Sequence, residues 1–259
     1  MKTFLKQIAL EAGKTALDYK SRLSEIRIEH KGTVKDIVTE ADVAVEHYLI
    51  EQIKKTYPDH GILGEETGVH AGNEYRWIID PIDGTTSFAH DQPFFSNSIA
   101  LEKNGELILA AVNIPVMGEL FMAEKGKGAT LNDKSIHVSG RDKLLDCVIA
   151  TGFVCLRQNL THNNLPYFNR VAPLIRSIRR YGSAAIDLSY TACGRFDGYW
   201  ELSLNYYDIA AGMLILKEAG GTVTDFSGSG DNIPAETLAT NTHIHRELLA
   251  LLMEVKTQQ

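Results

Sequence analysis

Residues 77 to 88 carry the strongest signal in this chain and read Trp77-Ile78-Ile79-Asp80-Pro81-Ile82-Asp83-Gly84-Thr85-Thr86-Ser87-Phe88. The first three are apolar, as in a short buried strand that ends at an acid. Pro81 restricts the backbone between Asp80 and Asp83, so we expect both carboxylates to face one place. The glycine and threonines that follow supply backbone N–H groups at a predicted helix start, where anions bind. The stretch therefore predicts two carboxylates beside an anion site.

Two more acidic groups stand where predicted elements begin or end. Glu65 and Glu66 follow the apolar run 61–64, and Asp208 opens a predicted helix over residues 209–219. Each group taken alone is typical of a loop edge, a tight turn or a helix cap. Taken together, carboxylates with no softer ligand nearby suit a hard cation, magnesium first, because they would otherwise repel one another. A metal ion beside an anion site is what hydrolysis of a phosphate ester needs.

The first half of the chain predicts two helices and several strands. Apolar residues recur at helical spacing over residues 4–17 and again after Thr39, which suits an N-cap. Asn104-Gly105 joins two predicted strands within residues 98–115, and this dipeptide is a strong hairpin signal. These strands indicate a sheet with antiparallel neighbours.

In the second half, predicted helices alternate with strands, at residues 183–193, 199–202, 209–219, 222–226 and 243–255. The pattern predicts layered helices and sheets, an α/β fold, in one unit over residues 1–259. We expect an antiparallel sheet in residues 1–140 and a more α/β arrangement in residues 141–259.

Composition narrows the class of protein. The 259 residues are 44% hydrophobic and 23% charged, as in an ordinary globular protein. No apolar run approaches the roughly 18 residues of a membrane span, and the N-terminus is typical of an amphipathic helix rather than a signal peptide. Cys147, Cys155 and Cys193 form no CxxC pair, which favours a reducing cytoplasm over a disulfide framework. The net charge of −7 argues against a nucleic-acid surface. We expect a cytoplasmic protein with neither membrane nor nucleic acid as partner.

Three motifs, in their order along the chain, resemble the signatures of the inositol monophosphatase family. They are Gly64-Glu65-Glu66-Thr67, the stretch 77–88, and Asp208-Ile209-Ala210-Ala211-Gly212 with Glu218-Ala219-Gly220-Gly221. The resemblance extends over nearly the whole chain and is closer to bacterial members. It implies an αβαβα sandwich, a homodimer, and a phosphatase that depends on two magnesium ions and is sensitive to lithium.

The resemblance also implies which residues bind metal. Glu66, Asp80 and the carbonyl of Ile82 would hold one magnesium ion. Asp80, Asp83 and Asp208 would hold the second, so that Asp80 bridges the two. Lys31 and Asp36 match a loop that supports a weaker third ion in the family.

Catalytic and substrate-binding roles follow from the same resemblance. Thr85 would orient the attacking water together with Glu66 and the first ion, and no covalent phosphoenzyme is needed. Glu201 matches an acid that grips sugar or inositol hydroxyls. The full set of implied substrate contacts is Gly84, Thr85, Gly182, Ser183, Ala184, Glu201 and Asp208.

Several alternatives stay open at this point. The expected substrate is myo-inositol 1-phosphate, but the same chemistry suits fructose 1,6-bisphosphate, histidinol phosphate or a 3'-phosphonucleotide. A more remote alternative is a non-catalytic binding or regulatory protein with the same fold. Tyr207 stands where the family often has tryptophan, and residues 151–154 lack a serine pair found in vertebrate-type members. Both departures bear on the substrate rather than on metal binding.

Two groups of basic side chains remain without an assigned role. Arg176, Arg179 and Arg180 would either guide an anionic substrate or join a subunit contact, and the sequence does not decide between these. His243 and His245 lack an acidic partner nearby in the sequence, so we expect them on a solvated helix face.

Overall fold

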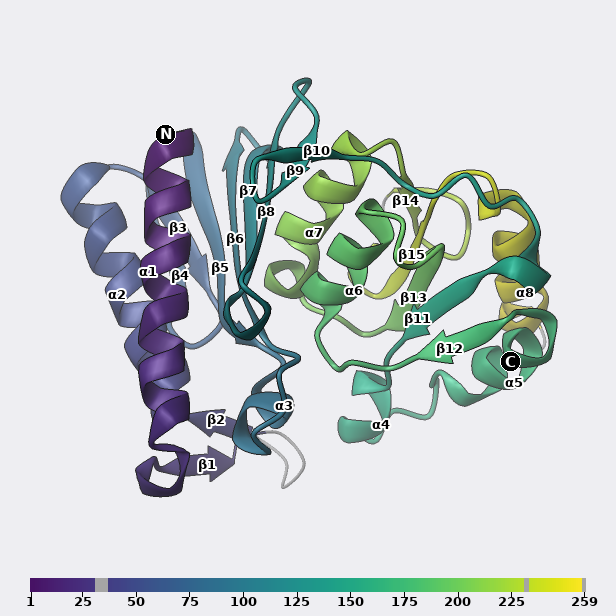
Figure 1. Cartoon of the computed structure of the whole chain (residues 1–259), viewed down its shortest axis with the longest axis horizontal. Coiled ribbons are helices and arrows are strands. Elements are labelled where there is room, and N and C mark those ends of the chain that lie inside the picture. The colour runs from purple at the N-terminus through teal and green to yellow at the C-terminus, as the bar shows by residue number, and fades with distance from the viewer. Residues whose placement is uncertain (31–36, 231–232, 258–259) are drawn as a thin grey trace.

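The structure is a computed structural model that describes residues 1–30, 37–230 and 233–257. Helices and sheets alternate in layers along the long axis of the molecule (Figure 1). The order is α1 with α2, a large sheet, α6 with α7, a second sheet, and α5 with α8. This arrangement confirms the predicted layered α/β fold.

The described helices are α1 (Lys2–Ser21), α2 (Glu40–Thr56), α3 (Thr85–Ala89), α4 (Val154–Arg157), α5 (Leu165–Val171), α6 (Ala184–Ala192), α7 (Tyr206–Glu218) and α8 (His245–Lys256). Short 3-10 turns lie at Leu23–Glu25, Pro115–Met117, Leu144–Asp146 and Ala172–Leu174. The longer helices match the ranges that hydrophobic spacing predicts, because each buries one apolar stripe or more against a sheet.

The large sheet is mostly antiparallel and comes from the first half of the chain. Its strand order is β10 (Lys134–Ile136), β9 (Ala129–Leu131), β8 (Glu119–Glu124), β7 (Glu106–Ile114), β6 (Ser96–Lys103), β5 (Tyr75–Asp83), β3 (Gly61–Gly64) and β4 (Gly68–His70). Only β3 and β5 pair in parallel within the described part of this sheet. The predicted hairpin turns at Asn104 and Gly105, whose φ angles of 52° and 80° are those an Asn-Gly turn favours. A separate short pair joins β1 (Ile28–His30) to β2 (Ile37–Thr39).

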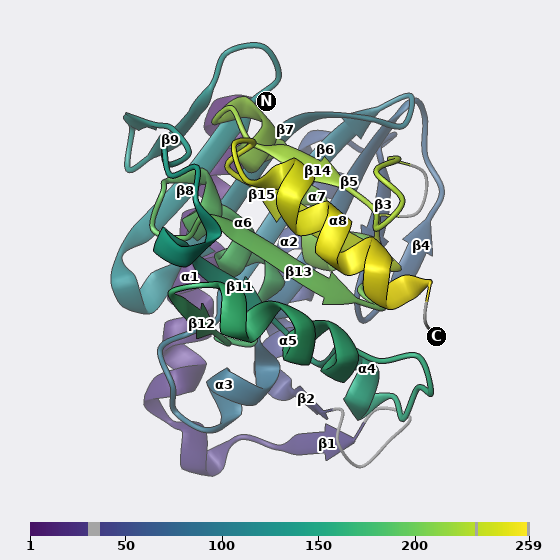
Figure 2. The same cartoon turned by 90° about the vertical axis from the view of Figure 1, so that its right-hand side faces the viewer.

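The second sheet mixes parallel and antiparallel pairs. Its order is β12 (Ser177–Arg179), β11 (Val148–Thr151), β13 (Gly198–Leu202), β15 (Glu236–Thr240) and β14 (Thr222–Thr224). Strand β11 runs parallel to β12 and β13, whereas β15 runs antiparallel to β13 and β14. Helices α5 and α8 lie side by side over its outer face (Figure 2). This mixed sheet is the more α/β arrangement expected of the second half.

Apolar side chains fill the spaces between the layers. Trp77 and Leu49 belong to the core between α1, α2 and the large sheet, and Trp200 belongs to the core under α5 and α8. Helix α7 lies between the two sheets and is buried on every face from Ile209 to Leu216. A helix in that position must be apolar all round, which explains its sequence. Its N-terminal end reaches the border between the two halves.

Two local predictions need correction. Asp208 does not open α7 but lies in its first turn, where its Oδ2 accepts a hydrogen bond from the Asn205 amide at 2.7 Å. His245 is not on a solvated face, because its ring is partly buried and contacts the hydroxyls of Thr224 and Thr240 at 3.1 and 3.0 Å. Burial lowers the pKa of His245. The first error is a local shift of the helix start by a few residues. The second arises because the contact of His245 with Thr224, 21 residues away, is invisible to periodicity.

In the described residues, no helix combines the length and the apolar character that crossing a membrane requires.

Candidate active site

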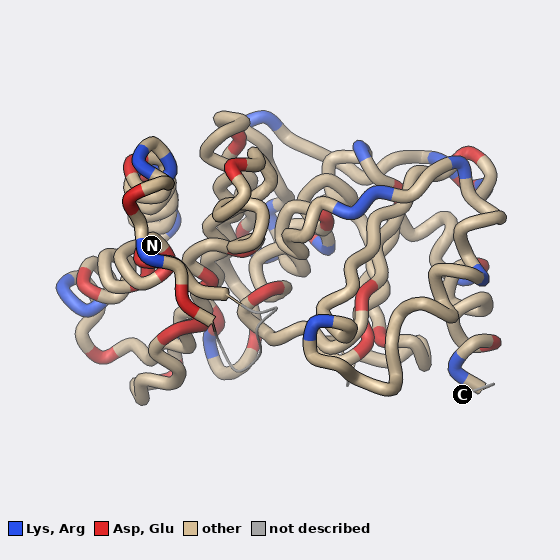
Figure 3. Tube along the Cα trace, turned by 90° about the horizontal axis from the view of Figure 1, so that it is seen from below, with Lys and Arg blue, Asp and Glu red and all other residues tan. Residues whose placement is uncertain are grey.

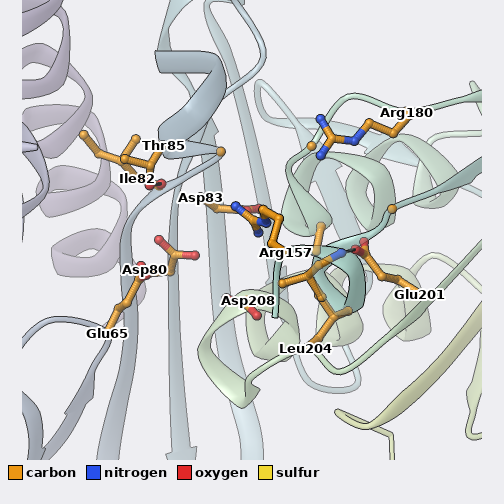
Figure 4. A pocket seen from close by; sticks show the side chains of 15 residues that line it. Glu65, Asp80, Ile82, Asp83, Thr85, Arg157, Arg180, Glu201, Leu204 and Asp208 are labelled. Atoms are coloured by element: carbon orange, nitrogen blue, oxygen red, sulfur yellow. Dashed lines mark hydrogen bonds between the residues drawn. The ribbon is translucent and has the colours of Figure 1, made fainter. Parts of the chain in front are cut away.

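A pocket lies where the two halves of the chain meet, and it gathers most of the predicted site residues. Its lining comprises Glu65, Asp80, Ile82, Asp83, Gly84, Thr85, Gly152, Val154, Arg157, Arg180, Gly182, Ala184, Glu201, Leu204 and Asp208. In the view of Figure 4, Glu65 and Asp80 lie on one side of this pocket and Glu201 lies on the other. Residues from strands, loops and helix ends far apart in sequence therefore converge here.

Strand β5 presents two carboxylates because its regular pairing is interrupted. The register with β6 shifts between Asp80 and Asp83, so these residues do not alternate as in a regular strand. Pro81 has no amide hydrogen to donate, and its carbonyl accepts a hydrogen bond from the Asn97 side chain at 2.7 Å. Both aspartates reach the pocket, which agrees with what the Asp-Pro-Ile-Asp spacing predicts.

Asp80 is the most deeply placed acid of the pocket. Its side chain is 2% exposed, and Oδ1 has no hydrogen-bond partner in the described chain. Burial raises its pKa well above the ordinary value, and the carboxylates of Glu65, Asp83 and Asp208 raise it further. A buried carboxylate oxygen without a donor, surrounded by other carboxylates, suits a bound cation.

In Asp83 and in Asp208, one of the two carboxylate oxygens accepts hydrogen bonds from the protein. Asp83 Oδ2 accepts hydrogen bonds from Ser183 Oγ and the Ala185 amide, both at 2.7 Å. Burial raises the pKa of Asp83 to about 7, although these two hydrogen bonds lower it in part. Burial, and after it the charge of Asp83, raises the pKa of Asp208 well above its ordinary value. The protein thus fixes the orientation of both groups and leaves their Oδ1 atoms without a hydrogen bond to any described residue.

The acid after strand β3 that lines the pocket is Glu65, whereas the sequence analysis named Glu66 as the metal ligand. Glu65 lines the pocket and is the neighbouring charge that raises the pKa of Asp80 most. Its amide donates to the carbonyl of Ile79 at 3.2 Å, so the chain still follows β5 at this residue. The Glu66 amide turns instead to the side chain of Glu46 on α2, at 2.9 Å. Two adjacent glutamates cannot be told apart by composition, and only the strand geometry decides which one enters the pocket.

Thr85 lies in the pocket, and behind it lies the buried carboxylate of Asp42, which the sequence analysis did not assign to the site. Thr85 Oγ1 lies 3.1 Å from Asp42 Oδ1 and 3.1 Å from the Ile82 carbonyl. Asp42 is itself held through Oδ2 by the amide and hydroxyl of Thr39, at 2.8 and 2.6 Å. The Thr-x-x-Asp spacing was a visible signal for the cap, but not for this second contact. Helix α2 therefore orients the hydroxyl of Thr85.

Glycine is required where Glu201 enters the pocket. A Cβ atom on Gly152 would lie 1.9 Å from Glu201 Oε2, so any other residue would displace the carboxylate. Glu201 Oε1 accepts from the Val154 amide at 3.0 Å, and Oε2 accepts from Tyr199 Oη at 2.7 Å. Burial raises the pKa of Glu201, and these two donors oppose the shift. The predicted position of Glu201 in the site agrees with the structure.

The residues around the start of α6 have two different positions, in the pocket lining or behind it. Gly182 and Ala184 line the pocket, as predicted. Ser183 is only 1% exposed and does not line it, since its hydroxyl caps α6 at the Ile186 amide and contacts Asp83. Ser183 therefore supports a carboxylate instead of facing the substrate space. Gly84 precedes α3 with φ of 100°, and its Cβ would lie 2.8 Å from the Phe94 carbonyl, so only glycine fits there.

Sequence reasoning missed Arg157 and left Arg180 undecided, and both line the pocket. The pKa of the Tyr207 hydroxyl is raised by burial and then by Glu65 and Asp208, so this ring lies close to the acids.

The predicted third-ion residues, Lys31 and Asp36, lie outside the described residues.

The oxygen atoms that could coordinate a metal ion in the pocket belong to carboxylates and to one backbone carbonyl. Such hard oxygen ligands suit magnesium and related cations. In the described residues, no three His, Cys, Asp or Glu side chains are already grouped closely enough to hold an ion by themselves. The set still fits a hard cation, because the Ile82 carbonyl and waters would complete the coordination and Asp80 Oδ1 lacks any other partner. A cation would also reverse the carboxylate pKa shifts by favouring the ionised forms.

Known proteins resemble this chain over nearly its whole length. The sequence pattern of the inositol monophosphatase family matches residues 1–257. The inositol-1-monophosphatase of Mesorhizobium japonicum is 40% identical, over 94% of this chain and 92% of its own. A protein named Nus factor SuhB from Pseudomonas aeruginosa is 42% identical, over 95% of this chain and 94% of its own. The solved inositol monophosphatase of Anabaena superposes with a TM-score of 0.87 at 37% identity, covering 98% of this chain and 95% of that one. The chain therefore belongs to the inositol monophosphatase family, a family of metal-dependent phosphoric monoester hydrolases.

Proposed function

We propose that this enzyme hydrolyses the phosphate ester of a small polyol or sugar with magnesium as its metal, and that myo-inositol 1-phosphate is a substrate. The observation that carries the proposal is the convergence of Glu65, Asp80, Asp83 and Asp208 on one pocket, with Asp80 Oδ1 buried and lacking a partner in the described chain. Acids in this arrangement are unfavourable by themselves and become favourable around divalent cations.

Two ions are proposed, with ligands that the pocket supports. Glu65, Asp80 and the Ile82 carbonyl would hold one, and Asp80, Asp83 and Asp208 would hold the other. When bound, magnesium supplies positive charge that activates a water molecule and neutralises the leaving oxygen. Glu65 takes the place in this scheme that the sequence analysis gave to Glu66.

The protein's own residues would orient the reactants. Asp42 holds the hydroxyl of Thr85, so that this hydroxyl is positioned to contact the attacking water. The amides of Gly84 and Thr85 would donate to the phosphate oxygens. On the opposite wall, Glu201 would accept hydrogen bonds from substrate hydroxyls, since Val154 and Tyr199 already fix its carboxylate.

The test is phosphate release from four compounds at neutral pH with magnesium, each repeated with a chelator. The compounds are myo-inositol 1-phosphate, fructose 1,6-bisphosphate, histidinol phosphate and a 3'-phosphonucleotide. Magnesium-dependent release from myo-inositol 1-phosphate would support the proposal, and addition of lithium should inhibit it. Folded protein that releases phosphate from none of them would contradict it and favour the binding or regulatory role that the SuhB-named relatives suggest.

A further inference from the structure

Asn164 lies at the start of α5, but its side chain does not cap this helix. Helix α5 belongs to the outer layer beyond the second sheet (Figure 1), and Asn164 occupies its N-cap position. An asparagine there ordinarily accepts a backbone N–H of the first turn, yet this side chain makes no such bond and is fully buried. The neighbouring Asn163 side chain accepts from the Leu165 amide instead, at 3.0 Å. The side chain of Asn164 is therefore directed at other segments of the protein.

The polar atoms of the Asn164 side chain all have partners inside the protein. Oδ1 accepts from Trp200 Nε1 at 2.7 Å, and Nδ2 donates to Thr151 Oγ1 and to the Gly152 carbonyl, at 2.7 and 2.6 Å. An indole N–H can only donate, so it must face the amide oxygen, and this fixes the orientation of the Asn164 amide. Thr151 Oγ1 donates in turn to the Trp200 carbonyl at 2.7 Å. Asn164, Thr151 and Trp200 thus form a closed ring of hydrogen bonds, the buried ring.

The buried ring holds the two chain segments that fix Glu201. Gly152 lies so close to this carboxylate that a Cβ there would be 1.9 Å from Oε2, and the Val154 amide donates to Oε1 at 3.0 Å. On the other side, Trp200 directly precedes Glu201 in β13. Strands β11 and β13 pair in parallel, with Thr151 opposite Trp200. The buried ring therefore fixes one neighbour of the carboxylate along the chain and another across the sheet.

We infer that Asn164 is a positioning residue, which sets the affinity of the pocket for substrate hydroxyls by holding Glu201 in place. The inference rests on the proposed function, in which Glu201 accepts hydrogen bonds from those hydroxyls. Asn164 itself does not line the pocket. A binding group must be held within roughly 0.5 Å of its productive position by the residues behind it. Loss of the buried ring would displace Glu201 and leave Asp80 and Asp83, which lie on β5, in place.

The first experiment compares myo-inositol 1-phosphate with p-nitrophenyl phosphate, which carries no hydroxyl, under magnesium. Asn164→Ala should raise KM for myo-inositol 1-phosphate about tenfold at nearly unchanged kcat, because binding common to the ground and transition states is lost. For p-nitrophenyl phosphate, kcat and KM should stay within about threefold of the wild type, and so should the magnesium requirement. Asn163→Ala is the matched control, since it removes a side-chain amide one position away that contacts α5 and not the buried ring.

A double-mutant cycle tests whether Asn164 acts through Glu201. Glu201→Gln alone should raise KM for myo-inositol 1-phosphate, and adding Asn164→Ala should raise it by no more than about twofold further. Independent effects that multiply would overturn the inference. It would also be overturned by Asn164→Ala losses that are equal on the two substrates, or by an unchanged KM for myo-inositol 1-phosphate.

Thr151 supplies a second pair of variants if Asn164→Ala does not fold. Thr151→Val nearly keeps the shape of the side chain but removes the hydroxyl that closes the buried ring, whereas Thr151→Ser retains that hydroxyl. Thr151→Val should raise KM for myo-inositol 1-phosphate, and Thr151→Ser should keep the wild-type value. Equal KM values for these two variants would count against the inference.

The wild type separates failure of the inference from failure of the proposed function. Release of phosphate from neither compound would overturn the proposed function and the inference with it. Release from p-nitrophenyl phosphate alone would overturn the proposed substrate and the proposed role of Glu201, and hence the inference. If myo-inositol 1-phosphate alone is hydrolysed, the double-mutant cycle and the Thr151 pair decide the inference with that one substrate.

Discussion

At the scale of single residues, adjacent acids have different surroundings and therefore different expected roles. Glu65 enters the pocket beside Asp80, whereas the Glu66 amide faces Glu46 outside it. Glu65→Gln should lower kcat by roughly 100-fold or more and raise the magnesium concentration needed for activity, because one proposed charged ligand is lost. The measurement is a magnesium titration of phosphate release.

Glu66→Gln is the matched comparison for that variant. It changes the same chemical group one position along the chain, so both variants alter the net charge equally. A smaller effect on kcat, within about threefold, is expected because Glu66 does not line the pocket. A larger loss in Glu66→Gln than in Glu65→Gln would contradict the ligand assignment.

Asp83 should make the stability of the metal-free protein depend on pH. Its pKa is raised from an ordinary 3.8 to about 7, so the native state binds this proton more tightly than the unfolded state does. The stabilisation is complete below about pH 4 and is lost as the pH rises through about 7. Asp83→Asn cannot ionise, so with a chelator present its Tm relative to the wild type should increase between pH 5.5 and pH 8.5.

The same Tm measurement is repeated with added magnesium. A bound cation favours the ionised carboxylate, so added magnesium should stabilise the wild type most at high pH and Asp83→Asn much less. Turnover of Asp83→Asn should fall by orders of magnitude although the protein still folds. A Tm difference that stays constant with pH would show that Asp83 titrates in its ordinary range.

At the scale of elements, the loop after β3 depends on a side chain from α2. Glu46 is fully buried, and its two oxygens accept the amides of Glu66 and Thr67 at 2.9 and 2.8 Å. Gly64 permits this approach, since its Cβ would lie 2.5 Å from Glu46 Oε1. A helix thus fixes the loop that carries Glu65 into the pocket.

Removing that support should affect both stability and metal use. Glu46→Ala is expected to destabilise the fold by about 3 kcal/mol, because two buried amides lose a charged acceptor. Urea unfolding measures this change, and the magnesium requirement of the folded variant should rise as Glu65 loses its fixed position. Glu51→Ala, at an exposed position of the same helix, is the control. An unchanged magnesium requirement would limit Glu46 to a structural role.

At the scale of the whole molecule, the pocket joins the two halves of the chain. The loop after β3 brings Glu65 and strand β5 brings Asp80 and Asp83 from the first half, while α7 and β13 bring Asp208 and Glu201 from the second. Lysines and arginines are scattered over both halves instead of forming one basic stripe (Figure 3). The arrangement is that of a small-molecule site between two layers, and the expected homodimer stays a prediction for measurement of mass in solution.

Because its proposed ligands come from both halves, bound metal should stabilise the molecule as a whole. Magnesium at about 100 times its Kd should raise Tm by roughly 5 °C or more in a single cooperative transition. Asp80→Asn, which removes the proposed bridging charge, should abolish most of this increase. Two transitions, of which magnesium moves only one, would show that the ions bind within one half.

The sequence by itself determined the alternation of helices and sheets, the Asn104-Gly105 hairpin and the presence of acids at element ends. These features depend on neighbours a few residues apart, such as helical periodicity, turn chemistry and the Asp-Pro-Ile-Asp spacing. Only the tertiary structure decided that Glu65 rather than Glu66 enters the pocket, that Ser183 supports Asp83, and that Asp42 holds Thr85. Each of those facts depends on a contact between segments from 20 to 100 residues apart. Burial, orientation and the pairing of charges arise from packing between distant segments, which no local pattern encodes.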